Sequence, residues 1–565
     1  MTLDRTMAGT VDDAVRAARS IDQPAFITVL DDEQRAALTA ATAPTSGSGS
    51  LAGVPFAAKD NIDVAGVPST AGCPTRVEPA AQSAFAVQRL IDAGAVPIGK
   101  TNMDQFATGL VGTRSPYGAC HSVASARHVS GGSSSGSAVA VALGVVPLAL
   151  GTDTAGSGRV PAAFNGIVGM KPSRGLVSNR GLLPACPSLD CITTLTSTVW
   201  EARTAFDALA VFDPDDPYAR PMPVAGPSGV AAHMRVIAVP DAPLDMDDAQ
   251  RAAWGAALAH AATIARVVPV DVAPFLAAAR LLYGGPFVAE RLAAFGALLE
   301  PDGPHLDPVV RKIVLGAEAV SGADTFRGMA ELARLRRAAE SVFAGADALL
   351  LPVTPGHPTL AEVAADPVGT NSALGTYTNM ANLLDLCAIA LPAGTRADGL
   401  PFGIQLLAPA FADRPLLSLA ARWAGEPDSS PQLGSDRVLL AVAGAHLTGQ
   451  PQNRELVELG GRLHARAATA GGYRMYTVPG PFPRPGLAHT GDGPDEGMAV
   501  EVWDLPYHGL GQLLPRIAPP LRLGQVTLDD ASVVTGFLAD THGLDAARDI
   551  TRFGGWRPYL ASLRS

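Results

Sequence analysis

Two glycine-rich turns that carry serine lie close together in the sequence. The first reads Ser-Gly-Gly-Ser-Ser-Ser-Gly-Ser and begins at Ser130, and the second reads Gly-Thr-Asp-Thr-Ala-Gly-Ser-Gly-Arg and begins at Gly151. Glycine lets a backbone approach a ligand closely, and a serine hydroxyl can attack a carbonyl or relay a proton. This pair of turns therefore predicts an active site for nucleophilic chemistry.

The stretch between the two turns argues against a flexible Gly/Ser linker. Residues 138–150 are almost entirely apolar, so they cannot lie in water, yet they are shorter than the roughly 20 residues that a membrane span needs. We expect a core helix that ends near Gly144, followed by a short buried strand that leads into the second turn.

The second turn also offers donors for a developing oxyanion. Ser157 follows Thr154, Ala155 and Gly156, and a turn of small residues can aim backbone amides at negative charge. These three residues form the candidate oxyanion hole, and Ser157 is the candidate nucleophile. Neither turn contains histidine, which argues against a Ser-His-Asp triad, although a histidine from a distant part of the chain could still complete one.

Lysine is rare in this chain, and its positions are informative. The chain has four lysines and 38 arginines, and three of the lysines, Lys59, Lys100 and Lys171, lie near the serine turns in sequence. A buried lysine can lose its proton, whereas an arginine cannot. The apolar neighbours Phe56 and Ile62 predict that Lys59 is the catalytic base, while Lys100 and Lys171 are predicted to be structural.

Composition is typical of a compact enzyme. Of 565 residues, 47% are hydrophobic and 17% are charged. The net charge is −11, and no run of lysine or arginine offers a binding site for a nucleic acid. The length predicts two or three domains. The first ten residues show no signal peptide, so we expect a cytoplasmic protein.

Cysteine and histidine usage indicates chemistry without a metal. The five cysteines include no C-x-x-C pair, which favours reduced thiols over a disulfide framework. The eleven histidines form no H-E-x-x-H or comparable ligand cluster. We therefore expect neither a metal nor another cofactor.

Periodicity predicts an α/β protein of two domains. Residues up to about 43 are predicted to be helical, and from Val54 short apolar runs alternate with helical stretches. Helices are predicted over 84–94, 248–266 and 324–344, and strands over 96–100, 348–352 and 388–392. The polar, proline-rich residues 426–435 predict a linker between a domain of residues 1–425 and a smaller α+β or barrel-like domain of residues 436–565.

Three segments, residues 54–62, 131–138 and 151–161, together resemble the amidase signature family, whose hydrolases use a Ser-Ser-Lys triad. The resemblance implies an α/β fold with a mixed central sheet covered by helices. It also implies that Ser157 is the nucleophile, that Ser133, 24 positions earlier, is the bridging serine, and that Lys59 is the base. In that family the bridging serine follows a non-proline cis peptide. Ser134 and Ser135 are alternatives with supporting roles, and Ser130 replaces a proline of many relatives.

Further segments resemble the allophanate hydrolases within this family. Residues 102–118 and 188–191 match their pattern, and residues 282–291 resemble the stretch that places a tyrosine and an arginine against the substrate carboxylate. The resemblance implies that Tyr283 and Arg291 bind substrate, because arginine can hold a carboxylate through two parallel hydrogen bonds. The alternative is an ordinary salt-bridged arginine on a helix face. Arg114 is a second candidate anion contact, or a residue that orders its loop.

Residues 443–453 and 553–559 resemble the C-terminal domain of longer allophanate hydrolases, which is similar to the γ-glutamyl cyclotransferase fold. The resemblance implies that the first domain releases ammonia and N-carboxycarbamate, and that the second domain decarboxylates this intermediate. His446 is the candidate catalytic residue there, since an imidazole can move a proton as the carboxylate leaves. Glu501 is a weaker candidate, or an outward charge on a strand. Decarboxylation can also be spontaneous, which would leave this domain a structural role.

The leading hypothesis is hydrolysis of allophanate in urea or cyanuric acid nitrogen catabolism. One alternative is hydrolysis of another small carboxylated amide such as malonamate, and a second is membership of an amidotransferase complex. Related enzymes suggest a homodimer, with a functional link to an upstream urea carboxylase. We expect neither a nucleic acid nor a membrane as partner.

Overall fold

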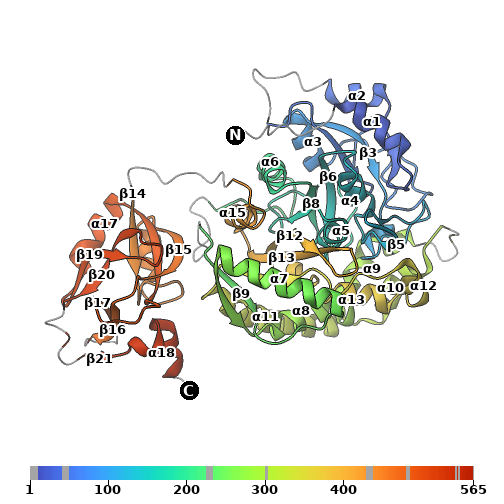
Figure 1. The fold of residues 1–565 in the computed structure, drawn as a ribbon. Helices are drawn as coiled ribbons and strands as arrows, with labels where there is room; N and C mark the ends of the chain where they lie inside the picture. The colour runs from blue at the N-terminus through green and yellow to red at the C-terminus, as the bar shows by residue number, and fades with distance from the viewer. Residues whose placement is uncertain are drawn as a thin grey trace.

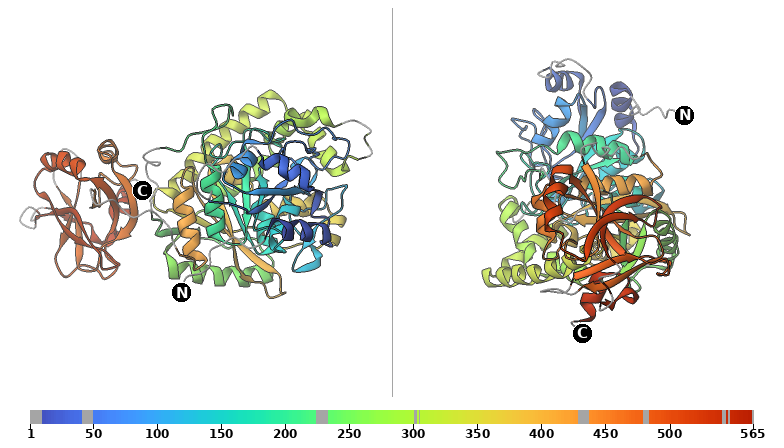
Figure 2. Two further views of the ribbon diagram at one scale, coloured as in Figure 1. Left: turned by 90° about the horizontal axis from the view of Figure 1, so that it is seen from above. Right: turned by 90° about the vertical axis from the view of Figure 1, so that its left-hand side faces the viewer.

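The computed structural model describes residues 10–40, 50–223, 233–299, 303, 305–427, 437–478, 484–540, 544 and 547–563. It contains a large N-terminal domain and a smaller C-terminal domain at one side of it (Figure 1). Figure 2 shows the same separation from above. Most of the predicted linker at 426–435 lies outside the described residues.

A mixed sheet forms the centre of the large domain. Among the described residues it has eleven strands in the order β1-β3-β2-β6-β8-β7-β12-β13-β11-β9-β10. Strands β2, β3 and β6 run parallel to one another, whereas β8 is antiparallel to β6. The strands are β1 (Phe26–Val29), β2 (Pro55–Lys59), β3 (Val96–Thr101), β6 (Leu148–Asp153), β7 (Val168–Lys171), β8 (Cys191–Thr196), β9 (Val236–Pro240), β10 (Arg266–Val270), β11 (Ala348–Pro352), β12 (Leu386–Thr395) and β13 (Pro401–Pro409).

Helices cover both faces of this sheet (Figure 1). Side chains of β6 alternate between the faces: Ala149 packs in the cluster that contains α4 and α5, and Leu148 and Leu150 pack in the cluster that contains α3. The helices are α1 (Val11–Ser20), α2 (Asp32–Thr39), α3 (Phe85–Asp92), α4 (Ser135–Ala142), α5 (Arg159–Asn165), α6 (Val199–Leu209), α7 (Asp248–Ile264), α8 (Ala273–Gly284), α9 (Ala289–Phe295), α10 (Pro308–Gly316), α11 (Gly322–Phe343), α12 (Leu360–Ala365), α13 (Gly369–Leu374), α14 (Met380–Leu383) and α15 (Asp413–Trp423). A small hairpin of β4 (His121–Ser122) and β5 (Ser125–Val129) lies outside the sheet.

The predicted elements around the serine turns are confirmed. Helix α4 ends just before Gly144, which has a positive φ of 69°, and strand β6 leads directly into the second turn. The prediction of a wholly helical N-terminal segment is wrong. Between α1 and α2 the chain forms β1, which pairs antiparallel with β3 at the edge of the sheet, because the half-buried run Phe26–Val29 satisfies an otherwise open strand edge.

The C-terminal domain is an α+β unit built on two sheets. A five-stranded sheet has the order β15-β18-β14-β20-β19, and a three-stranded sheet has the order β17-β16-β21. Its elements are β14 (Arg437–Val442), α16 (Asn453–Glu458), β15 (Arg462–Ala468), β16 (Tyr473–Val478), β17 (Arg484–His489), β18 (Ala499–Pro506), α17 (Tyr507–Leu513), β19 (Leu521–Thr527), β20 (Val533–Ala539), β21 (Arg548–Asp549) and α18 (Trp556–Ser562). Trp503 and its apolar neighbours give this domain its own core.

The two domains touch through polar contacts. The backbone N–H of His233 donates to the carbonyl of His464 at 2.7 Å, and Arg235 pairs with Asp529 at 3.1 Å. In the described part of the chain, no helix is long and apolar enough to cross a membrane. No group of three or more histidine, cysteine or acidic residues there could hold a metal ion, and all five cysteines are free and buried.

Candidate active site

Lys59 is the last residue of β2 and is completely buried. Its Nζ lies 2.8 Å from Ser133 Oγ and 2.6 Å from Thr152 Oγ1. Because β2 and β6 are parallel neighbours, their carboxyl ends meet at one edge of the sheet, where Lys59 and Thr152 face each other. The sheet thus places the amine against the first serine turn.

Burial lowers the pKa of Lys59 to about 7. Asp104, Asp190 and Asp153 oppose this shift through their negative charge, whereas the Arg291 guanidinium adds to it. No carboxylate of the described residues forms an ion pair with the amine. A large fraction of Lys59 is therefore neutral near pH 7 and can accept a proton.

The first turn presents a single serine to Lys59. The peptide bond between Gly132 and Ser133 is cis. Ser134 Oγ instead bonds both the carbonyl and the N–H of Thr152 at 3.2 Å, and Ser135 Oγ donates to the carbonyl of Asn102 at 3.4 Å. Ser134 and Ser135 thus have supporting contacts, and Ser133 is the serine that meets the amine.

Gly132 can only be glycine in this arrangement. A Cβ there would lie 2.1 Å from Asp104 Oδ2. That carboxylate is fixed because it accepts the backbone N–H groups of Gly112 at 3.0 Å and Arg114 at 2.9 Å. Asp104 therefore holds the loop of residues 104–114 against the first serine turn.

The second turn is held by a buried ion pair. Asp153 accepts two bonds of 2.9 Å from the Arg159 guanidinium, which lowers the pKa of Asp153 although burial alone would raise it. The same carboxylate accepts the N–H of Gly156 at 2.8 Å. Among the described residues, the N–H groups of Thr154 and Ala155 have no partner. Of the three candidate oxyanion donors, the Gly156 amide is thus engaged by Asp153, and the other two remain open.

Ser157 lies near the end of this turn, two residues before α5 begins, and is 2% exposed. The backbone N–H of Ser134 donates to its carbonyl at 3.2 Å, which joins the two turns. In the described part of the chain, its hydroxyl forms no hydrogen bond with Ser133 or any other residue. The structure therefore places Ser133 against Lys59 and leaves the Ser157 hydroxyl without a hydrogen-bond partner among the described residues.

Arg291 and Tyr283 lie together beside the triad, on α9 and α8. An Arg291 Nη2 group donates to the Tyr283 hydroxyl at 2.8 Å, and the guanidinium carbon lies 5.2 Å from the centre of the tyrosine ring. Arg291 is 1% exposed, its Nε has no hydrogen-bond partner, and no carboxylate among the described residues forms an ion pair with it. Asp190 interacts with this guanidinium electrostatically but does not form an ion pair with it. A buried cation without an ion-pair contact is costly, so this arrangement suits an anionic ligand.

Asp190 is a site residue that sequence reasoning missed. Its carboxylate accepts a short hydrogen bond from Thr154 Oγ1 and further bonds from the N–H groups of Ala185 at 2.8 Å and Cys186 at 3.0 Å. Burial raises its pKa to about 6, although Thr154 and Arg291 oppose that shift. Asp190 lies within residues 188–191, which resemble the allophanate hydrolase pattern, and this resemblance could have identified it as a site residue.

The Arg114 guanidinium orders its loop. It donates to the backbone carbonyls of Thr108 at 2.9 Å and Pro367 at 2.5 Å. Of the other lysines, Lys100 pairs with the buried Asp60 at 3.7 Å, and Lys171 donates to the carbonyl of Pro172 at 2.8 Å. These contacts agree with the structural roles predicted for both lysines.

His446 lies in the other domain, on the turn after β14. It lines a small cavity of about 120 Å³ together with Glu455, Arg484 and Arg516. His446 Nε2 lies 2.9 Å from Glu455, which also pairs with Arg516 at 2.6 Å. Burial lowers the pKa of His446, although Glu455 opposes the shift. The structure thus forms a second polar pocket away from the triad.

Glu501 is buried rather than directed outward to water. Its side chain is 1% exposed on β18 and pairs with Arg557 at 2.9 Å. The alternating pattern of β18 suggested an exposed position, but residues of the N-terminal domain line a cavity together with Glu501 on this face.

Comparison with known proteins identifies the family of this chain. Residues 10–417 match the family model described as Amidase. The chain belongs to the amidase family. Residues 438–561 match the model described as allophanate hydrolase C-terminal domain. The fold is the amidase signature fold, as the resemblance implied.

Individual relatives cover the chain to different extents. The chain is 40% identical over 550 residues to urea amidolyases of Lachancea kluyveri and Saccharomyces cerevisiae, which covers 91% of this chain but only 30% of theirs. The crystal structure of Kluyveromyces lactis allophanate hydrolase has a TM-score of 0.72 and 37% identity, and the match covers 98% of this chain and 97% of that one. A glutamyl-tRNA(Gln) amidotransferase subunit from Halobacterium salinarum is 35% identical over 68% of this chain and 98% of that one.

We predict that Ser157→Ala lowers kcat by roughly 10⁴-fold or more with the fold intact, because the attacking oxygen is lost. Ser135→Ala is the matched control, since its hydroxyl contacts the Asn102 carbonyl at 3.4 Å and the Cys120 thiol rather than Lys59, and it should lower kcat by less than about tenfold. Ammonia release and circular dichroism check both variants. Comparable activity of Ser157→Ala would contradict the nucleophile assignment.

We also predict that kcat/KM rises with pH through the pKa of Lys59 of about 7 and falls about tenfold for each unit below it, since only the neutral amine accepts a proton. A pH profile of ammonia release measures this limb. Asp190, with a pKa of about 6, also titrates nearby, so Asp190→Asn separates the two groups. A limb that disappears in that variant would assign it to Asp190 instead.

Proposed function

We propose that this protein hydrolyses the terminal amide of allophanate (urea-1-carboxylate). The observation that carries this proposal is the buried Arg291 without a carboxylate partner among the described residues, beside the Lys59 and Ser133 pair. Allophanate combines an amide with a carboxylate on one small molecule. Its carboxylate would pair with Arg291 and Tyr283 while the amide carbonyl lies at Ser157. The allophanate hydrolase of known structure, similar over nearly its whole length, supports this substrate.

The triad acts as a proton relay in this proposal. Neutral Lys59 accepts the proton of Ser133, which in turn accepts the proton of Ser157 as Ser157 Oγ attacks the amide carbon. The N–H groups of Thr154 and Ala155 stabilise the oxyanion. The relay then returns a proton to the nitrogen, and ammonia leaves. Water attacks the acyl-enzyme by the same relay and releases N-carboxycarbamate.

The C-terminal pocket would act on that product. N-carboxycarbamate takes up one proton and breaks a C–N bond, giving CO₂ and carbamate. His446, hydrogen-bonded to Glu455, can hold and deliver the proton that the nitrogen receives. Arg484 and Arg516, which line the same cavity, carry the positive charge that a dianion requires.

The wider setting follows from the substrate. We propose a role in urea or cyanuric acid nitrogen catabolism, with a functional link to a urea carboxylase that supplies allophanate. The match to only part of the longer urea amidolyases supports such a link. We further propose that the protein acts in the cytoplasm as a homodimer. Gel filtration of the purified protein tests the oligomeric state.

Arg291→Met is expected to lower kcat/KM for allophanate by roughly two orders of magnitude, because it removes one partner of a buried charge pair. Biuret, which carries an amide in place of the carboxylate, is the matched neutral substrate, and its turnover should fall much less. Arg291→Lys should retain intermediate activity. Equal losses for both substrates would contradict a role in carboxylate recognition.

Substrate comparison separates the alternatives. Ammonia release by the purified chain alone should be greatest with allophanate, lower with malonamate and lowest with neutral amides. Preference for malonamate would favour the alternative that the protein hydrolyses another small carboxylated amide. A requirement for partner proteins would favour membership of an amidotransferase complex.

His446→Asn is expected to leave the first ammonia release unchanged and to delay CO₂ release, so that N-carboxycarbamate accumulates. Rapid-quench ¹³C NMR of labelled allophanate follows both steps. Unchanged CO₂ kinetics would show that decarboxylation does not need His446.

A further inference from the structure

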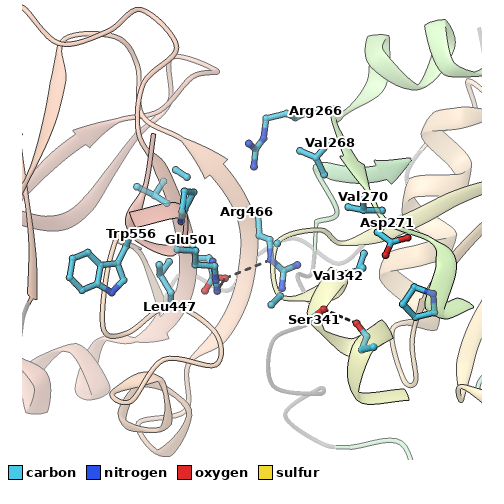
Figure 3. A pocket seen from close by; sticks show the side chains of 18 residues that line it. Arg266, Val268, Val270, Asp271, Ser341, Val342, Leu447, Arg466, Glu501 and Trp556 are labelled. Carbon is cyan, nitrogen blue, oxygen red and sulfur yellow. Dashed lines mark hydrogen bonds and ion pairs between the residues drawn. The ribbon is translucent and has the colours of Figure 1, made fainter. Parts of the chain in front are cut away.

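Three buried charged residues form a chain across the domain boundary. Asp347 of the N-terminal domain pairs with Arg466 of β15 through a short contact, and Arg466 Nε lies 3.6 Å from Glu501 of β18. Asp347, Arg466 and Glu501 are 3%, 4% and 1% exposed, respectively. Figure 3 shows Arg466 between the two domains, linked to Glu501. Charges buried to this extent are stable only when they are paired.

Asp347 is firmly anchored in the central sheet. It precedes β11, and its carboxylate accepts the N–H groups of Arg235 at 2.7 Å and Val236 at 2.8 Å, where β9 begins. Its own N–H donates to the carbonyl of Val236 at 2.8 Å. The N-terminal domain thus offers Arg466 a carboxylate whose position is set by the sheet.

Glu501 leads from the boundary to the turn that carries His446. Its carboxylate accepts the N–H of Thr448 at 2.7 Å and the Thr448 hydroxyl at 3.0 Å. Arg557 closes this arrangement, since it donates to Glu501 at 2.9 Å and to the carbonyl of Thr448 at 2.7 Å. Thr448 is two residues from His446, so Glu501 sets the conformation of this turn.

Little else supports the chain from the side of the N-terminal domain. A cavity of about 710 Å³, lined by residues of both domains, lies beside it (Figure 3). Leu447, Arg466 and Glu501 are part of its wall, as are Val268 and Val342 of the N-terminal domain. Close apolar packing between the domains therefore does not hold the turn at this point. Within the C-terminal domain the turn is held by Glu501, Arg557 and Asn453, whose Nδ2 donates to the His446 carbonyl at 2.8 Å. The ion pair with Asp347 links this arrangement to the N-terminal domain.

We propose that Asp347 of the N-terminal domain acts through Arg466 and Glu501 as a positioning residue for the turn that presents His446. Every residue that lines the second pocket belongs to the C-terminal domain, and docking of the two domains then stabilises the turn that carries His446. Its significance for decarboxylation rests on the proposed function of the C-terminal domain. The order of the turn itself can be measured without that function.

The test compares the full chain with its variants Asp347→Asn and Arg466→Lys. Asparagine keeps an acceptor for the β9 amides but removes the charge, and lysine keeps the charge but cannot bridge two carboxylates as a guanidinium does. Hydrogen exchange of peptides covering residues 443–453 should accelerate about tenfold in Asp347→Asn and less in Arg466→Lys, because the turn opens locally. CO₂ release should slow in the same order, while ammonia release stays within about twofold of wild type, which also shows that the N-terminal domain is folded.

Asp529→Asn is the matched control. It removes another ion pair across the same boundary, with Arg235 at 3.1 Å, that has no contact with Glu501. Exchange over residues 443–453 should be unchanged in it. Equal protection of the turn in all variants, or the same acceleration in Asp529→Asn, would overturn the proposal. If His446→Asn leaves CO₂ release unaffected while Asp347→Asn opens the turn, the decarboxylase assignment fails and the positioning role stands.

Discussion

The burial of one amine is the constraint on which the large domain depends. Lys59 lies at the end of a central strand without a carboxylate in ion-pair contact, and desolvation lowers its pKa to about 7. An exposed lysine at the same position would remain an ammonium ion and could not take a proton from a serine. The sheet on both sides of β2 and the loop of residues 104–114 together keep water from this amine. The α/β fold thereby keeps the pKa of Lys59 low.

The acidic side chains around this amine have hydrogen-bond or ion-pair partners of their own. Asp153 is neutralised by Arg159, and Asp104 and Asp190 are satisfied by backbone N–H groups or hydroxyls, so each acidic group near Lys59 has its own partners. Arg291 is the exception among the described residues, with a tyrosine hydroxyl as its close contact. A folded protein tolerates such a buried cation when a ligand supplies the missing charge. The same electrostatic balance thus supports both the proposed base and the proposed preference for an anionic amide.

The C-terminal domain also contains a pocket with partly buried polar and charged side chains. His446 and Glu455 form a polar pair in a pocket whose lining also includes Phe537, Leu521, Arg484 and Arg516. Under the proposed function, the second site would receive the anionic product of the first. The ion chain from Asp347 to Glu501 links the large domain to the turn that carries His446, because Arg466 contacts a buried carboxylate of each domain.

Much of the first site could be predicted from the sequence. The glycine-rich turns, the scarcity of lysine and the spacing of Ser133 and Ser157 are local features, and helix α4 and strand β6 follow from the apolar run between the turns. Local periodicity failed at β1, because a strand of four half-buried residues depends on its partner β3 and not on its own pattern.

Contacts between distant segments were decided only by the tertiary structure. Asp190 reaches Thr154, Thr152 meets Lys59, and Glu501 is buried where the two domains meet. The residue types that could do chemistry were readable from the sequence, since nucleophile, base and glycine turns have recognisable local signatures. Which charges are paired, and which one remains for a substrate, depended on folding, because burial and pairing arise between residues that the sequence keeps far apart.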